Sequence, residues 1–144
     1  PETVRGKRVL DFASGSGMVA IAAALSGAAA VVAADIDPWA KCAVRLNAAL
    51  NGVSIDFTND DLIGRSVDVD VILAGDVFYE SDFAKALVAW FSATAKDGCL
   101  VLVGDPGLSY RPIDNLEPLA TYEVPVTRVL EDSEIKKTTV WQFL

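Results

Sequence analysis

The sequence predicts an α/β fold with a doubly wound, seven-stranded, mostly parallel sheet whose last strand is antiparallel. Short apolar runs rich in β-branched residues alternate with stretches of helical periodicity, which is typical of right-handed βαβ units. The acidic segment Glu131-Asp132-Ser133-Glu134 predicts an exposed turn between the last two strands, which favours a hairpin there. The expected strands are Arg8–Phe12, Ala30–Asp35, Ser54–Thr58, Val69–Gly75, Cys99–Gly104, Thr121–Val126 and Thr138–Phe143.

The first expected helix, Ser16–Leu25, follows a glycine-rich turn directly after the first strand. The second is expected to have Asp37 as its N-cap, Pro38 in its first turn and Asn51-Gly52 as its stop signal. Within this second helix Cys42, Leu46 and Ala49 share one face, which we expect to cover the sheet.

A third helix is predicted to begin at Ser81-Asp82 and to end at Asp97-Gly98. Its expected buried residues are Phe83, Leu87, Trp90 and Phe91. Three prolines, Pro106, Pro112 and Pro118, interrupt the pattern between Asp105 and Ala120, which predicts a loop with at most a short helix. Because this loop follows a parallel strand, we expect it to carry substrate contacts.

Length and composition indicate one domain over residues 1–144, because a chain of this size that is 52% hydrophobic can bury its own core. The formal net charge of −8 and the absence of a basic cluster argue against a nucleic-acid substrate. Cys42 and Cys99 are expected to be reduced, buried thiols in a cytoplasmic protein. Since there is no histidine, Ser-His-Asp and Cys-His catalysis are excluded, and we expect no metal site.

The stretch from Phe12 to Ala34 contains no charged residue, and its hydropathy alone could indicate a membrane span. Gly27 interrupts it, and Asp11 and Asp35 lie at its two ends. A helix followed by a buried strand explains this pattern better, so we expect no membrane association.

The most informative motif is Asp11-Phe12-Ala13-Ser14-Gly15-Ser16-Gly17, where an apolar strand ends on a carboxylate and enters a glycine-rich turn. Ser14, Gly15 and Gly17 would bring a ligand against the backbone and against the free N–H groups of the following helix. The same turn also fits a dinucleotide-binding pattern, with Asp35 lying 20 residues after Gly15. Asp11 would repel a pyrophosphate but attract the sulfonium and ammonium of S-adenosylmethionine, so we favour the latter over NAD.

Carboxylates follow three further strands. Asp35, with its neighbour Ile36, is placed to accept the ribose hydroxyls of the cofactor, although an ordinary turn acid is the simpler alternative. Of the adjacent pair Asp60 and Asp61, we favour Asp61 for the exocyclic amine of adenine because it directly precedes an apolar pair.

Asp76 and Tyr79 lie where the fourth strand leaves the sheet, next to the position expected for the transferred methyl group. A carboxylate and a phenol there could act on the group that accepts the methyl. The simpler alternative is that Asp76 caps the next turn and Tyr79 belongs to the core.

Together these residues resemble the class I, seven-β-strand, Rossmann-like methyltransferases that use S-adenosylmethionine, with Ala13 in place of the first glycine of their acidic-x-Gly-x-Gly-x-Gly element. Asp76-Val77-Phe78-Tyr79 is similar to the (Asp/Glu)-x-x-(Tyr/Phe) motif of the family 16 protein lysine methyltransferases. The closest resemblance within that group is to the enzymes that methylate the β subunit of electron transfer flavoprotein. It implies protein-lysine N-methylation, with Asp76 orienting the lysine and Tyr79 shaping its channel.

Two other functions stay open from the sequence, namely a small-molecule methyltransferase and a noncatalytic binding module of the same fold. Family members also begin with a helical segment that covers the cofactor, whereas Pro1 lies about one turn before the first strand. We therefore expect this chain to lack the N-terminal lid, to bind cofactor weakly and to have little activity as it stands.

Overall fold

One sheet organises the molecule, and its strand order is β3-β2-β1-β4-β5-β7-β6. The computed structural model describes residues 2–107, 109–112, 114, 116–125 and 135–144. In these residues the strands are β1 (Arg8–Phe12), β2 (Ala30–Ala34), β3 (Asp56–Thr58), β4 (Val71–Gly75), β5 (Leu100–Asp105), β6 (Leu116–Pro125) and β7 (Ile135–Phe143). The helices are α1 (Met18–Leu25), α2 (Ala40–Leu50) and α3 (Ser81–Lys96).

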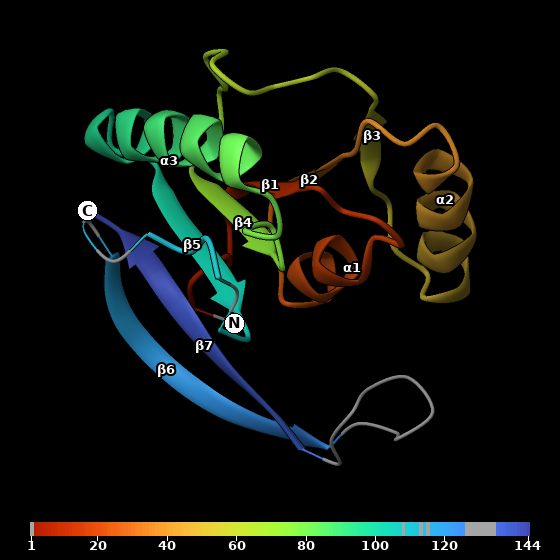
Figure 1. The fold of residues 1–144 in the computed structure, drawn as a ribbon. Helices are drawn as coiled ribbons and strands as arrows, with labels where there is room; N and C mark the ends of the chain where they lie inside the picture. The colour runs from red at the N-terminus through yellow and green to blue at the C-terminus, as the bar shows by residue number, and fades with distance from the viewer. Residues whose placement is uncertain (1, 108, 113, 115, 126–134) are drawn as a thin grey trace.

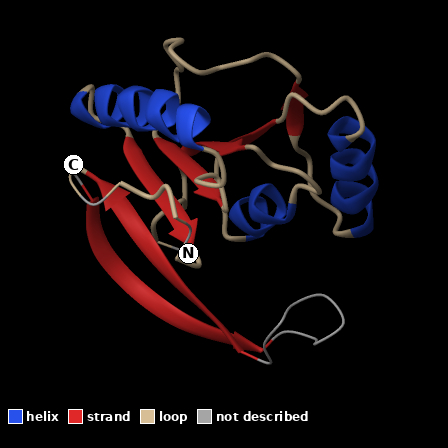
Figure 2. Cartoon of the chain, in the orientation of Figure 1, coloured by secondary structure: helices blue, strands red, loops and turns tan. Residues whose placement is uncertain are grey.

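Helices cover both faces of the sheet, with α3 on one side and α1 and α2 on the other (Figure 1; Figure 2). Alternate residues of each strand feed the two cores. Leu10 and Ile72 belong to the cluster that includes Phe91 of α3, whereas Val9 and Val71 belong to the cluster that includes residues of α1 and α2. The predicted doubly wound architecture is therefore confirmed.

The strand directions also agree with the prediction. β1, β2, β3, β4 and β5 run parallel to one another, and β7 runs antiparallel to both β5 and β6. The expected acidic turn, Glu131 to Glu134, lies outside the described residues.

The segment from Asp105 to Ala120 differs from the expected loop, because β6 begins at Leu116 and includes Pro118. A proline cannot donate a backbone hydrogen bond, so it is tolerated in edge strands and at irregularities. β6 is one of the two edge strands of the sheet, and its pairing with β7 shifts register between Pro118 and Ala120. The sequence shows the proline but not that its strand lies at an edge.

The start of α1 differs slightly from the prediction, whereas that of α3 agrees with it. α1 begins at Met18, because Ser16 belongs to the preceding turn. α3 begins as predicted at Ser81, and Glu80 caps it by accepting hydrogen bonds of 2.9 Å from the backbone N–H groups of Asp82 and Phe83. Phe83 is half-buried, while the other three residues predicted to be buried in this helix are buried.

Two predictions for α2 are wrong. The helix begins at Ala40, so Asp37 is not its N-cap, although the Asp37 carboxylate accepts a 2.9 Å hydrogen bond from the N–H of Trp39 just before the helix. Its predicted packing face is also wrong, because Cys42, Leu46 and Ala49 are exposed. The buried face consists of Ala40, Val44 and Ala48.

Both cysteines are free thiols, as expected, but Cys42 is exposed and Cys99 only partly buried. Among the helices of the described residues, none is long and apolar enough to cross a membrane. In the same residues no group of Cys, Asp and Glu side chains is arranged to hold a metal ion.

Candidate active site at the carboxyl edge of the sheet

The carboxyl ends of β1, β2, β3 and β4 meet at one edge of the sheet because these strands are parallel. A cavity of about 280 Å³ opens at this edge. Four of the residues that line it carry carboxylate or phenol groups: Asp35, Asp60, Asp61 and Tyr79. The remaining lining residues are Phe12, Ala13, Ala34, Ile36, Leu62, Ile63 and Phe83. The cavity thus combines apolar walls with a few polar groups, as small-molecule sites commonly do.

The glycine-rich turn forms one side of this edge. Ala13 lies at the start of the turn with φ of 56°, in the left-handed region that glycine normally occupies. The N–H of Ser14 donates to the carbonyl of Ala34 at 3.1 Å, which ties the turn to the end of β2. The buried Ser14 hydroxyl oxygen has no hydrogen-bond partner within the described chain.

Gly15 and Gly17 both have positive φ, 50° and 79°, but different surroundings. A Cβ on Gly15 would meet nothing within 4 Å, so this position faces open space that a ligand could occupy. A Cβ on Gly17 would lie 2.9 Å from Cγ2 of Val44 on α2. The structure therefore gives Gly17 a role in the packing of the turn against α2.

Asp11 ends up underneath the turn and is not among the residues lining the cavity. Only 1% of its surface is exposed, and its carboxylate accepts a 2.8 Å hydrogen bond from the N–H of Ala20 in α1. Burial raises the pKa of Asp11 to about 7, although the hydrogen bond from Ala20 opposes this rise. Asp11 thus anchors α1 to β1 and places a titratable charge beneath the site.

Asp35 connects the turn to the cavity. Its Oδ2 accepts a 2.7 Å hydrogen bond from the N–H of Gly15, and its Oδ1 accepts one of 2.9 Å from the N–H of Asp37. A carboxylate has about four lone-pair sites, so both oxygens can still accept hydroxyl groups from a ligand. Its exposed neighbour Ile36 also lines the cavity.

Asp60 and Asp61, which follow β3, both line the cavity, so their positions do not show which of them would contact adenine. The Asp61 carboxylate accepts a 3.1 Å hydrogen bond from the N–H of Ile63, which orients it. Asn59 donates to the carbonyl of Asp35 at 3.1 Å and joins this loop to the end of β2.

Asp76 is exposed directly after β4 and has φ of 54°. Its N–H donates to the carbonyl of Gly104 in β5 at 3.0 Å, which fixes this unusual backbone conformation. The next two residues, Val77 and Phe78, are buried, whereas Tyr79 is 64% exposed and has its ring centroid 5.4 Å from that of Phe83. Tyr79 therefore faces the cavity and is not a core residue.

This geometry agrees with similarities to known proteins. Residues 2–101 match the family described as ribosomal protein L11 methyltransferase (PrmA). The chain is 41% identical to an electron transfer flavoprotein beta subunit lysine methyltransferase of Xenopus laevis, and 36% identical to that of Homo sapiens, over 99% of its length in both cases. The chain belongs to the PrmA methyltransferase family.

The chain spans 61% and 57% of the length of these two relatives. Among solved structures, magnesium protoporphyrin IX methyltransferase of Synechocystis PCC 6803, crystallised with bound SAM, superposes with a TM-score of 0.67. That match covers 97% of this chain and 71% of the other at 15% sequence identity, so it supports the shared fold.

One residue at the carboxyl edge of the sheet in this PrmA-family chain, Asp105, was not predicted from the sequence. Asp105 ends β5, and its side chain is fully buried in a 2.9 Å ion pair with Arg111. Asp105 follows an apolar strand as Asp11 does, and this pattern could have identified it. The apolar cavity residues Phe12, Leu62, Ile63 and Phe83 carry no comparable signal in the sequence.

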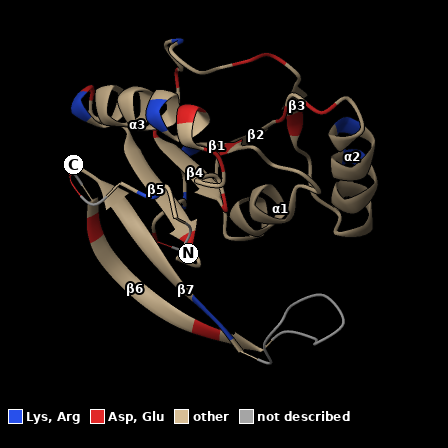
Figure 3. Cartoon of the chain, viewed as in Figure 1, with Lys and Arg blue, Asp and Glu red and all other residues tan. Residues whose placement is uncertain are grey.

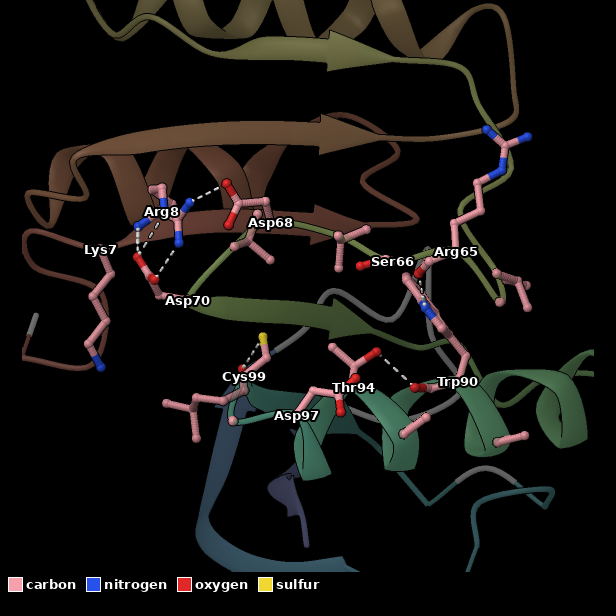
Figure 4. A pocket seen from close by; sticks show the side chains of 18 of the residues that line it. Lys7, Arg8, Arg65, Ser66, Asp68, Asp70, Trp90, Thr94, Asp97 and Cys99 are labelled. Carbon is pink, nitrogen blue, oxygen red and sulfur yellow. Dashed lines mark hydrogen bonds and ion pairs between the residues drawn. The ribbon is translucent and has the colours of Figure 1, made fainter.

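A larger hollow of about 970 Å³ lies elsewhere, between the loop that precedes β4 and the later turns of α3 (Figure 4). Arg8, at its border, forms ion pairs with Asp68 at 2.6 Å and with Asp70 at 2.9 Å. None of the predicted site residues lines this hollow. It adjoins the cavity, because Ile63 lines both, but it contains none of the groups of the candidate active site.

Proposed function

We propose that this chain is the catalytic part of an S-adenosylmethionine-dependent protein-lysine N-methyltransferase, and that its substrate is the β subunit of electron transfer flavoprotein. The substrate assignment is supported by relatives of that name at 36% and 41% identity over 99% of the chain. The observation that carries the proposal is the arrangement of Asp35, Asp61 and Tyr79 around one cavity, with Asp76 at the adjoining strand end.

The cofactor assignment rests on how well the described residues fit S-adenosylmethionine. The open space at Gly15 and the unpartnered hydroxyl of Ser14 offer room and a hydrogen-bonding group beside the turn. Asp35 would accept the ribose hydroxyls, and Asp61 would accept the exocyclic amine of adenine. Asp11, when ionised, would favour a cationic ligand near the turn.

When bound, S-adenosylmethionine would supply a methyl group on a sulfonium sulfur, and that sulfur would keep the electron pair of the broken C–S bond as a neutral thioether. The protein then mainly has to hold the acceptor nitrogen in line and to exclude competing water. Asp76 would accept hydrogen bonds from the lysine ammonium and orient it, and Tyr79 would contact the cation with its ring face.

Asp76 is not assigned as the general base. A nearby carboxylate favours the charged form of lysine, whose usual pKa is about 10.4. The proton would therefore leave to solvent water, and the freed lone pair of the lysine nitrogen would form the new bond to the methyl carbon. The two free thiols further support a reducing, cytoplasmic environment for this reaction.

The test is methyl transfer to electron transfer flavoprotein by the full-length protein, measured by mass spectrometry, for the parent and for Asp76→Asn. Asparagine adopts left-handed backbone conformations readily, so the variant should fold normally at this position. Loss of the carboxylate should lower kcat/KM by about 100-fold, because the acceptor is no longer oriented.

The matched control is Asp68→Asn, which removes an exposed carboxylate whose side chain pairs with Arg8 at 2.6 Å and which does not line the cavity. This variant should retain the parent rate. Transfer at the parent rate by Asp76→Asn would refute the role of Asp76. Methylation of a small molecule instead of the flavoprotein, or of nothing, would refute the protein-lysine assignment.

A further inference from the structure

The fully buried carboxylate of Asp105 is the centre of a cluster outside the cofactor cavity. One of its oxygens, Oδ2, accepts a 2.9 Å hydrogen bond from the N–H of Gly107 and also forms the 2.9 Å ion pair with Arg111. The ion pair spans six residues of the loop that follows β5. Because the desolvation of such a pair offsets much of its attraction, stability alone is a weak reason for it.

Arg111 is held from a second side by Trp141 of β7, since its guanidinium carbon lies 4.4 Å from the centre of the indole ring. Trp141 is directly opposite Val103 in the pairing of β7 with β5, and Asp105 is opposite Thr139. The Arg111 side chain is therefore fixed between the carboxyl end of β5 and the neighbouring strand β7. We call Asp105, Arg111 and Trp141 the loop clamp.

The loop held by this clamp comes close in the fold to the segment of Asp76 and Tyr79. Tyr110 and Pro112 line a hollow of about 420 Å³ together with Ser81, Ala84, Lys85, Val88 and Ala89 of α3. Ser81 follows Tyr79 by two residues. The same strand end also contacts Asp76, because the carbonyl of Gly104, directly before Asp105, accepts the Asp76 N–H.

We propose that Arg111 is a positioning residue for the protein acceptor. By joining Asp105 to Trp141, it fixes Tyr110 and Pro112 as the wall beside Asp76 and Tyr79 where the polypeptide around the target lysine docks. This inference rests on the proposed lysine methyltransferase function. None of the three clamp residues lines the cofactor cavity, so the clamp acts on the acceptor and not on the cofactor.

The test uses the full-length protein and compares Arg111→Met and Arg111→Lys with the parent. Steady-state methylation of electron transfer flavoprotein gives kcat and KM for the acceptor, and calorimetric titration gives the Kd for S-adenosylmethionine. For Arg111→Met we expect the acceptor KM to rise and kcat/KM to fall by roughly 10- to 100-fold, as expected for a misplaced binding wall. The cofactor Kd should stay within about twofold, and Arg111→Lys should recover part of the loss because it keeps the charge but not the planar stack.

Arg8→Met is the matched control, because it breaks an ion pair of the same length, 2.9 Å to Asp70, at the opposite edge of the sheet (Figure 4). It should leave the acceptor KM unchanged. Should Arg111→Met fold poorly, the double variant Asp105→Asn, Arg111→Gln removes both charges and should show the same rise in KM.

The proposal is overturned if Arg111→Met keeps the parent KM, or if its kinetic loss is matched by Arg8→Met and so reflects stability alone. An inactive parent protein would instead refute the proposed function, and the clamp's role in acceptor docking with it.

Discussion

At the residue scale, backbone strain is concentrated at the two ends of the site. Ala13 and Asp76 are the non-glycine residues with positive φ in the described part of the chain, and they follow β1 and β4. Strained backbone of this kind persists where the surrounding structure enforces it, and it is common at functional sites. Ala13 occupies the position at which the resembled motif has glycine, so its strain comes from one extra methyl group.

Replacing Ala13 by glycine should relieve that strain. The left-handed conformation costs an alanine about 1 to 2 kcal/mol, and the glycine loses part of this gain through greater freedom in the unfolded chain. We expect Ala13→Gly to raise the free energy of unfolding by about 0.5 to 1 kcal/mol, measured by urea denaturation. The same substitution at exposed Ala49 in α2 should instead lower it by about 1 kcal/mol. A loss of stability at both positions would contradict this explanation.

The raised pKa of Asp11 predicts an unusual pH dependence of the free energy of unfolding. Its pKa is raised from 3.8 to about 7 in the folded protein, so the folded state binds more protons than the unfolded state between these values. Its contribution to stability is complete below about pH 4 and is lost as pH rises through 7. Relative to Asp11→Asn, the parent should lose about 3 kcal/mol of unfolding free energy between pH 5 and pH 8.

Denaturation of both proteins at several pH values measures this difference, and the other carboxylates cancel in the comparison. A parallel pH profile for the two proteins would show that Asp11 is not the responsible group. Since the ionised carboxylate favours a cationic ligand, S-adenosylmethionine should also bind the parent more tightly at pH 8 than at pH 6, and Asp11→Asn should remove most of this gain.

The sequence identified Asp11, Asp35 and Asp76 because each lies at or next to the carboxyl end of a strand, and the structure places all three at the same edge of the sheet. It did not distinguish their surroundings. Asp11 contacts backbone beneath the turn, and Asp105 meets Arg111, because these partners depend on the path of a helix or loop. Strand-end position is visible in a sequence, whereas the partner of a side chain depends on tertiary packing.

At the element scale, α2 shows how close packing decides which face of a helix is buried. Its sequence offers two possible apolar stripes, and the one containing Leu46 has the larger side chains, yet the stripe of Ala40, Val44 and Ala48 is buried. Val44 lies so close to Gly17 that a Cβ there would be 2.9 Å from it. Helices this close require small side chains at their contact, so size and not hydropathy chose the face.

Truncation of each stripe tests this explanation. Val44→Ala should lower the free energy of unfolding by about 2 kcal/mol, because Val44 is 1% exposed and its loss leaves a cavity. Leu46→Ala removes more atoms, but Leu46 is 67% exposed, and the change should stay within about 0.5 kcal/mol. Urea denaturation of both variants gives the comparison. A larger loss for Leu46→Ala would mean that the predicted face is the packed one.

At the scale of the whole molecule, the alternation of strands and helices was enough to predict the sheet and its two helical layers. β6 was harder to predict, because Pro118 breaks the local sequence pattern. A proline is tolerated in this strand because the strand lies at an edge of the sheet. Charge is another property of the whole chain. Lys and Arg residues are scattered over several elements in Figure 3, and the net charge of the chain is −8.

This charge distribution predicts that nucleic acids are not the methyl acceptor. Affinity for nucleic acids comes largely from neutralising phosphates with clustered Lys and Arg, and an acidic surface opposes it. We expect a fluorescently labelled structured RNA to bind this chain with a Kd weaker than about 10⁻⁴ M at physiological salt, measured by anisotropy. Lowering the salt concentration should not produce strong binding, since few basic side chains can neutralise phosphates and so release the counterions of the RNA. Micromolar binding that weakens steeply with added salt would show a cationic surface that the sequence and the described residues do not indicate, and would favour an RNA acceptor over a protein one.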